Sequence, residues 1–262
     1  GLTNYWNITI SQKLGVRLMT WGRAEQTIHH RDETTLSNFN NATGGLLGDS
    51  QFLLRYLVYN DGLGSGKRLF LGGGLTIPSK NTLTEDPFFL NGETKTEHRH
   101  FSISEGLYKG VLESQFYKKR DKNPVFIGGS LITEFPLKEN KYGYKGSNLY
   151  AVSLTALSSP ILKNHGSVGA SLSARHTTQA YWNGYPAPNS LSTIITAGFT
   201  VTFNTNIGVL GVGVQRPTFL QGGIAGTSSE DIDQRLDAIQ MTISFRRMLD
   251  FTIPWIDPLK DL

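Results

Sequence analysis

Apolar and polar side chains alternate with a period of two along most of this 262-residue chain. In Leu236–Arg246, every second residue from Ile239 to Phe245 is apolar and the residues between them are polar. Because successive side chains of a strand point to opposite faces, this pattern predicts strands with one apolar and one polar face. The other segments that we predict as strands are Tyr5–Ser11, Leu14–Arg23, Ser50–Tyr59, Arg68–Ile77, Glu105–Lys118, Val125–Phe135, Asn148–Ala156, Ser167–Arg175, Ser192–Phe203 and Ile207–Gln215.

The connections between these segments alternate between short and long. Outer-membrane barrels have tight periplasmic turns and extended outer loops, whereas a soluble sandwich has no reason to lengthen every second connection. We therefore expect an all-β fold, an antiparallel transmembrane β-barrel of the bacterial outer membrane. The short connections are Gln12–Lys13, Asp61–Lys67, Asp121–Pro124, Ser158–Asn164 and Thr205–Asn206, and the long ones are Glu25–Gly48, Ser79–Ser104, Leu137–Ser147, Thr177–Leu191 and Arg216–Arg235.

The number of predicted strands is odd. Eleven segments alternate, but bacterial single-chain barrels have an even number of strands. If Gln12–Lys13 is a periplasmic turn, a further strand should precede residue 1, which gives about twelve. We expect residues 1–246 to form the barrel. Residues 247–262 contain two prolines and no alternation, and we expect them to form a periplasmic tail.

Composition limits the other fold and partner classes. No apolar run reaches the roughly 18 residues that a transmembrane helix needs, so strands would have to cross the bilayer. Cysteine is absent, which excludes a disulfide framework and a thiolate metal site. The net charge of +4 is dispersed without a run of five like charges, so we expect no nucleic-acid partner. Aromatic residues near strand ends, such as Tyr59 and Tyr150, suit either interfacial girdles or packing of the loops.

The polar faces of the strands would point into the barrel. Charges of both signs in a narrow barrel can pair across it and plug it, or they can line a selective path, and the sequence leaves both readings open. The predicted lumen-lining residues are Arg17, Gln51, Arg55, Thr76, Glu113, Glu134, Arg175, Thr200, Gln240 and Arg246.

The sequence was expected to show a metal site, a catalytic serine motif or a phosphate-binding loop only through particular residue spacings. His29 and His30 lie in one long loop and His98 and His100 in the next, so imidazoles could meet there around a metal ion, although solvated loop histidines are the simpler reading. No G-x-S-x-G motif is present. The glycine-rich segment Asp61–Lys67 lacks phosphate-loop spacing and reads as a hairpin turn. We expect no enzymatic activity and no cofactor.

One long run resembles a known family. The segment GLLGDSQFLLRYLVYNDGLGSGKRLFLGGGLTIPSK has Gly48–Asp49 before a strand, the pair Arg55–Tyr56, a turn, and a strand from Gly72 to Leu75 that ends at Pro78. It is similar to the core signature of the outer-membrane family described by the MetA pathway of phenol degradation. ITISQKLGVRLM resembles the opening hairpin of that family and DAIQMTISFR its closing strand.

The resemblance implies an outer-membrane barrel, sometimes called a transporter, without an established chemistry. The sequence departs from the family pattern by an insertion at Glu97–Ser104 and by a tail beyond Phe245.

The functional hypotheses follow from this fold. The first is a passive outer-membrane channel or transporter for a small solute, with a polar lumen. The second is a plugged barrel that serves as a structural or docking subunit of a surface complex. The third is a soluble β-sandwich binding module. The expected partners are outer-membrane lipid and lipopolysaccharide, a small solute, and a protein that contacts the long loops or the tail.

Overall fold

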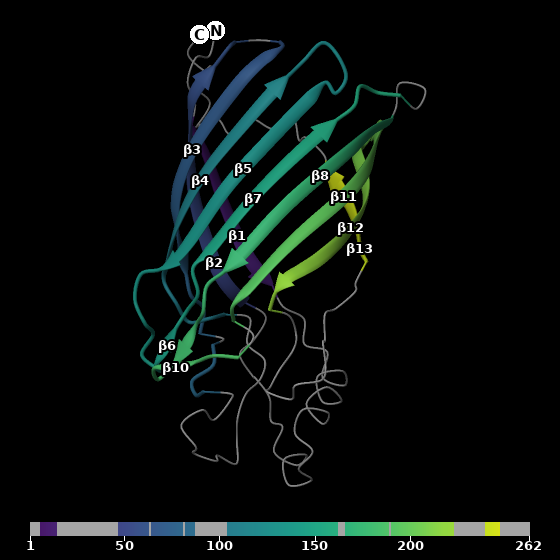
Figure 1. Cartoon of the computed structure of the whole chain (residues 1–262). Coiled ribbons are helices and arrows are strands. Elements are labelled where there is room, and N and C mark those ends of the chain that lie inside the picture. Colours follow the sequence, from purple (N-terminus) through teal and green to yellow (C-terminus); the bar gives the residue numbers. More distant parts are fainter. Residues whose placement is uncertain are drawn as a thin grey trace, which may run out of the picture.

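The computed structural model is all-β in the part of the chain that it describes, residues 6–14, 47–62, 64–80, 82–86, 104–161, 166–188, 190–222 and 239–246. No helix in these residues is long and apolar enough to span a membrane. Ten strands form one antiparallel sheet, shown in Figure 1. They are β1 (Trp6–Leu14), β2 (Leu47–Asn60), β3 (Gly66–Ile77), β4 (Lys109–Lys119), β5 (Phe126–Pro136), β7 (Leu149–Leu157), β8 (Gly166–Thr177), β11 (Ser192–Thr205), β12 (Gly208–Gln221) and β13 (Gln240–Arg246).

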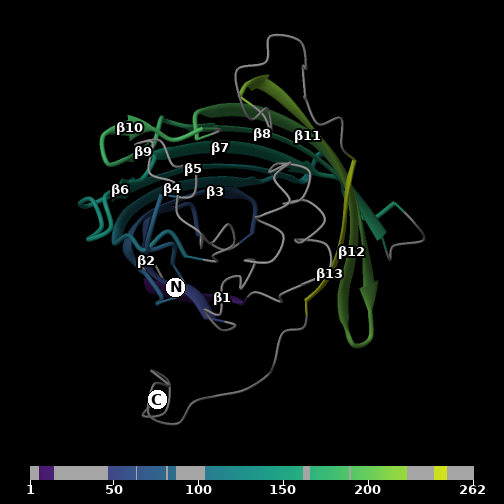
Figure 2. The same cartoon turned by 90° about the horizontal axis from the view of Figure 1, so that it is seen from below.

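Each strand of this sheet pairs with the next one along the chain, so the sheet is a meander. Figure 2 shows that the sheet is curved, so that it has a concave and a convex face. The edge strands β1 and β13 are joined by no backbone pairing among the described residues. Since ten antiparallel strands alternate in direction, β1 and β13 run in opposite directions.

The first predicted hairpin is wrong. Gln12 and Lys13 lie inside β1 and form no turn, and β1 pairs directly with β2, with Trp6 opposite Tyr56. The sheet therefore has no place between them for the predicted strand Leu14–Arg23, whose residues after Leu14 lie outside the described part. Among the described residues the main sheet has ten strands, whereas we counted eleven. Ten is an even number, so the described strands do not show the odd count of the predicted ones.

The alternation of connection lengths survives this correction. The connections at one end of the sheet span residues 61–65, 120–125, 158–165 and 206–207, and those at the other end span 15–46, 78–108, 137–148, 178–191 and 222–239. We call these the short-turn end and the long-loop end. They lie at the top and the bottom of Figure 1.

Strand β12 is longer than the alternation predicted. It continues past Gln215 to Gln221, so the predicted connection Arg216–Arg235 begins inside a strand. Pro217 pairs with Thr196 of β11, while the described residues of β13 pair only as far as Gln215. A proline has no amide hydrogen to donate and is tolerated on an edge, which fits a part of β12 that has one partner among the described residues.

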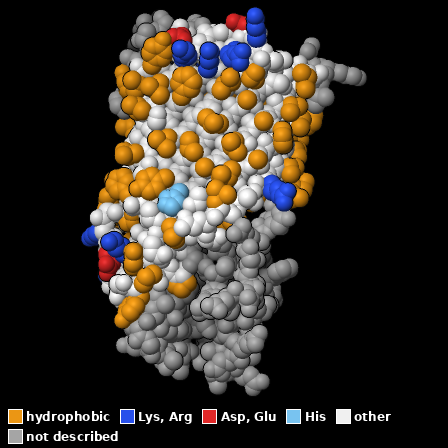
Figure 3. Space-filling model, in the orientation of Figure 1, with side chains coloured by type: hydrophobic (Ala, Val, Ile, Leu, Met, Phe, Trp, Pro, Cys, Tyr) orange, Lys and Arg blue, Asp and Glu red, His pale blue; other side chains and the backbone are white. Residues whose placement is uncertain are grey.

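The convex face of the sheet is apolar. Large side chains such as Leu112, Leu154 and Phe199 are 57, 57 and 68% exposed there. Figure 3 shows the hydrophobic side chains of this face spread over the middle of the sheet. The described strands contain three acidic residues, Asp49, Glu113 and Glu134, and by strand alternation all three lie on the concave face. Among the strand residues whose side chains are described, the lysines and arginines of the convex face are Lys67, Lys118 and Arg216.

A second, small sheet was missed by the sequence analysis. It has the order β10-β9-β6 and lies at the long-loop end, as Figure 1 shows. Its buried core is Ala180, Trp182 and Ala187. The turn Asn183–Gly184 has positive φ at both residues, and Asn-Gly is a strong hairpin signal that could have revealed it. The strands are β6 (Tyr144–Lys145), β9 (Tyr181–Trp182) and β10 (Tyr185–Pro186).

Candidate functional site on the concave face

An ion pair between Arg55 of β2 and Glu113 of β4 lies on the concave face. The Arg55 side chain uses two nitrogens: Nε donates to Oε2 of Glu113, and a terminal nitrogen donates to Oε1 at 3.2 Å. The side chains are 19 and 3% exposed, so both charges are largely withdrawn from solvent. A buried charge needs such a partner, because its desolvation is otherwise uncompensated.

The two residues of this pair are on strands that are not paired with each other. In the register, Arg55 of β2 is opposite Gly72 of β3, and Gly72 is opposite Glu113 of β4. A Cβ at Gly72 would lie 3.1 Å from Cγ of Arg55 and 3.4 Å from Oε2 of Glu113. The glycine therefore leaves the space through which the two side chains meet.

The ion pair continues into a chain of hydrogen bonds along β4. Nε2 of Gln115 donates to Oε1 of Glu113, and the Tyr117 hydroxyl donates to Oε1 of Gln115 at 2.7 Å. Residues 113, 115 and 117 alternate along one strand, so all three side chains point the same way. This network holds the Glu113 carboxylate in one orientation.

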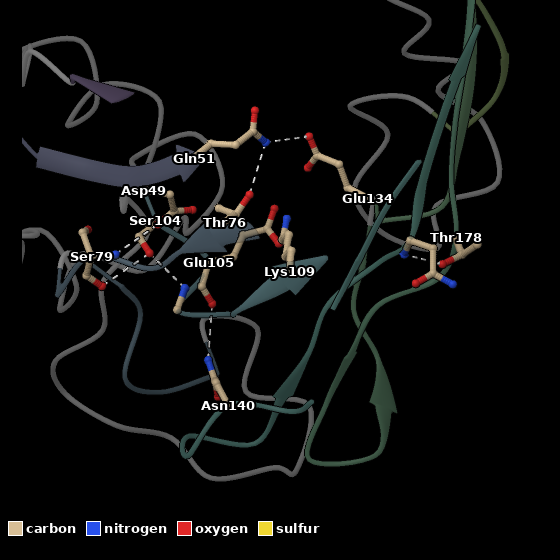
Figure 4. Close-up of polar contacts among 12 residues, drawn as sticks. Asp49, Gln51, Thr76, Ser79, Ser104, Glu105, Lys109, Glu134, Asn140 and Thr178 are labelled. Carbon is tan, nitrogen blue, oxygen red and sulfur yellow. Dashed lines mark hydrogen bonds and ion pairs between the residues drawn. The ribbon is translucent and has the colours of Figure 1, made fainter. Parts of the chain in front are cut away.

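A second polar contact crosses the concave face nearer the long-loop end. Nε2 of Gln51 lies 3.2 Å from Oγ1 of Thr76 and 3.4 Å from Oε1 of Glu134. Figure 4 shows Gln51 and Glu134 pointing toward one another from β2 and β5. Lys109 also lies on this face, and its Nζ is 2.7 Å from Oε2 of Glu105. Five of the predicted residues thus form two contact groups, Arg55 with Glu113 and Gln51 with Thr76 and Glu134.

The long-loop end of this region is tied down by further hydrogen bonds. The Ser79 amide donates to Oδ1 of Asp49 at 3.2 Å, and the Gly106 amide donates to Oγ of Ser104 at 3.0 Å. Asn140 donates to the Glu105 carbonyl at 3.3 Å, as Figure 4 shows. The connections that follow β3 and β5 are therefore attached to each other and to the sheet end.

Apolar residues also lie on the concave face, which the sequence analysis missed. Leu53 and Val111 are 6 and 3% exposed, and both are opposite Gly74 in the register. Leu57 is fully buried on the same face. We had expected the inward face to be polar and had named no apolar residue among the lumen-lining ones. The signal that could have revealed the difference is the unbroken run from Phe52 to Leu54, in which Leu53 interrupts the alternation.

The opposite wall, from β7 to β12, is lined by small and hydroxylated residues. Ser153, Ser173 and Thr196 are aligned in one row across three strands. Ser130 and Ser153 share a hydrogen bond of 2.7 Å. This wall contrasts with the charged wall of β2 to β5, because it carries hydroxyl groups and few charges.

The remaining predicted lumen residues lie apart from the two contact groups. Arg175 of β8 is on the concave face, opposite Ala151 and Ile194, and is exposed. Thr200 is opposite Gly169 and Gly213, and a Cβ at Gly213 would lie 3.2 Å from its hydroxyl. Gln240 and Arg246 alternate with the exposed apolar residues of β13. Arg17 lies outside the described residues.

The four histidines that we named as candidate metal ligands lie outside the described residues; they are His29, His30, His98 and His100. Within the described part of the chain, no group of three or more His, Asp or Glu side chains could hold a metal ion.

No protein-family model matches the sequence, and no curated protein matches it significantly.

Proposed function

We propose that this chain is a transmembrane β-barrel of the bacterial outer membrane and that it passes a small polar solute without catalysis. The observation that carries the proposal is the separation of side-chain chemistry between the two faces of the sheet. Apolar residues such as Leu112 and Leu154 are more than half exposed on the convex face, whereas the acidic strand residues all lie on the concave face. A bilayer would cover the convex face, and its exposure to water would be costly.

The architecture supports the same proposal. The main-sheet strands other than β13 have 9 to 14 residues, which is long enough to cross a bilayer, because a transmembrane strand needs about 9–11 residues. An even number of strands and opposite directions of β1 and β13 would allow closure without further strands. Closure satisfies the hydrogen bonds of both edges, which is required inside lipid.

The two walls of the concave face would act together on the solute. The Arg55–Glu113 ion pair is internally neutralised, while Arg175 forms no ion pair with a described residue and is exposed. Arg175 would therefore set the electrostatic preference of the path, and the hydroxylated wall would offer hydrogen bonds to a polar solute.

Planar-bilayer conductance of the purified full chain tests this function. Heat-modifiable gel migration first establishes that the chain folds in detergent. We expect conductance steps, and we expect Arg175→Glu to shift the reversal potential in a salt gradient toward cation preference. Lys145→Glu, the same charge change in the small sheet outside the strands of the main sheet, is the matched control and should leave the preference unchanged. Folded protein that never conducts would reject the channel.

A second candidate function is a plugged barrel that docks a partner. The contacts that Gln51 makes across the interior favour it, because they bring β2 and β5 together over a part of the lumen. The ordered small sheet at the long-loop end would then be the docking element. A silent bilayer together with a partner that co-purifies in fixed stoichiometry would support this candidate over the channel.

A further inference from the structure

Two lysines face each other on the convex surface of the sheet. Lys67 of β3 is directly opposite Lys118 of β4 in the antiparallel register. Both alternate with apolar convex residues, so both point away from the interior. Like charges directly opposite each other on a sheet are destabilising unless something compensates them. We refer to Lys67 and Lys118 as the lysine pair.

The chain itself supplies little compensation. Neither member of the lysine pair forms an ion pair with a described residue, and the described strands carry no acidic residue on the convex face. Residues 61–68 and 118–125 contain six basic and two acidic side chains, a net charge of +4. Both acids already have hydrogen-bond partners. Asp61 accepts a hydrogen bond of 2.7 Å from the Lys67 amide, and Asp121 accepts one from the Ser65 hydroxyl.

Asp61 is the acid nearest to Lys67 in sequence. The hydrogen bond that Asp61 accepts from the Tyr59 hydroxyl lowers the pKa of Asp61. The hydrogen bond from the Lys67 amide and the positive charges of Lys67 and Arg68 lower it further. Its charge offsets part of that of Lys67, but the excess of positive charge around the turn remains.

The neighbouring Arg68, in contrast, has hydrogen-bond partners for its guanidinium within the turn. Its guanidinium donates to the carbonyls of Gly62 and Gly64 at 2.7 and 3.4 Å and so holds the turn. By alternation Arg68 points to the opposite face from Lys67. The lysine pair has no comparable role in the turn.

The position of the lysine pair is the border of the apolar surface. Figure 3 shows Lys and Arg side chains gathered along the short-turn end, next to the hydrophobic side chains of the convex face. A side chain at this level of a membrane barrel would lie among lipid headgroups. Lysine can keep its stem on apolar surface and place its ammonium in that layer.

We infer that the lysine pair binds the phosphate of an anionic phospholipid in the leaflet at the short-turn end. This inference rests on the proposed transmembrane barrel. A headgroup phosphate would lie between two ammonium groups and convert a repulsive pair into two attractive contacts. Juxtamembrane lysines attract anionic headgroups by about 1 kcal/mol each, which corresponds to roughly fivefold in affinity per lysine.

Native mass spectrometry of lipids retained by the folded full chain tests the inference. The chain is reconstituted in nanodiscs of equal parts phosphatidylglycerol and phosphatidylcholine, then released and weighed with its bound lipids. We expect wild type to retain phosphatidylglycerol preferentially and Lys67→Gln/Lys118→Gln to lose at least fivefold of that preference. Lys67→Arg/Lys118→Arg should keep it. Lys141→Gln/Lys145→Gln, with the same charge change at the long-loop end, is the matched control and should also keep it.

Three outcomes would overturn the inference. One is an unchanged lipid preference in the glutamine variant, and another is an equal loss in the control variant. The third is displacement of phosphatidylglycerol by equimolar inorganic phosphate or lipid A, which would assign the site to another phosphate source. Flotation with neutral phosphatidylcholine vesicles is measured separately: a folded chain that fails to float rejects the barrel itself, whereas a chain that floats without lipid preference rejects only the lysine pair.

Discussion

Arg55 of β2 and Glu113 of β4 form an ion pair across Gly72 of β3, which joins two strands that share no backbone hydrogen bond. The residues are 58 positions apart in sequence. The two side chains can meet only if the concave faces of β2 and β4 approach each other across β3, where Gly72 has no side chain. The ion pair therefore stabilises the local curvature of the sheet.

Removal of one partner should destabilise the fold more than removal of both. Glu113→Leu leaves the Arg55 guanidinium without its carboxylate in a largely buried position, and we expect a loss of about 3–5 kcal/mol in the free energy of unfolding. The double variant Arg55→Met/Glu113→Leu should recover most of this loss. Urea titration of the protein in detergent micelles measures both, and a double variant as unstable as the single one would contradict the explanation.

The glycines of β3 should differ sharply in their tolerance of a methyl group. A Cβ at Gly74 would clash with the Phe52 carbonyl oxygen, whereas at Gly73 the nearest atom would be 3.8 Å away. We expect Gly74→Ala to cost about 1–3 kcal/mol or to prevent folding, because backbone must move. Gly73→Ala is the matched control and should fold like wild type. The folded fraction on a heat-modifiability gel measures the difference, and equal tolerance at the two positions would reject it.

A charge on the convex face should be costly only in lipid. Leu154 is 57% exposed, so in water Leu154→Arg would change stability by no more than about 0.5 kcal/mol. In a bilayer the same change should cost about 2–4 kcal/mol near the midplane. Thr155→Arg, on the concave face of the same strand, is the control. Unfolding titrations in phospholipid vesicles measure both variants. A Leu154→Arg protein as stable as the control there would contradict a lipid-facing surface.

The small sheet should loosen at alkaline pH. Burial, with a smaller contribution from Glu105, raises the pKa of Tyr144 above its usual value near 10. The folded state thus holds this proton more tightly than the unfolded state, and the stabilisation is complete below pH 10 and is lost as the pH rises beyond it.

The Tyr144 ring lies 4.8 Å from that of Trp182, so near-ultraviolet circular dichroism reports the change. We expect wild type to lose tryptophan signal between pH 10 and 12 and Tyr144→Phe to retain it to higher pH. Coincident curves for the two proteins would show that Tyr144 does not control the transition.

Much of the concave face could be predicted from sequence, because the face of a strand residue depends only on whether its position is odd or even. Thr76, Glu113 and Glu134 were placed with Gln51 and Arg55 on this basis, and all five lie on one face. Leu53 and Leu57 obey the same rule, because their odd positions put them on this face, but polarity alone would not have assigned two leucines to it.

The first hairpin was misplaced for a related reason. Alternation over residues 5–23 is the same whether the segment forms one strand or two, and only the pairing of Trp6 with Tyr56 shows that β1 continues through Gln12. The small sheet went unnoticed because two-residue strands are too short to show a period.

The sequence by itself determined the all-β class, the two-sided strands and the alternation of short and long connections, because these depend on residues close together in the chain. Only the tertiary structure decided the number of strands in the sheet, the meeting of Arg55 with Glu113 over Gly72, and the opposition of Lys67 and Lys118. Each of these depends on the register between strands, which is settled by contacts between residues far apart in sequence and by the space that individual glycines leave between them.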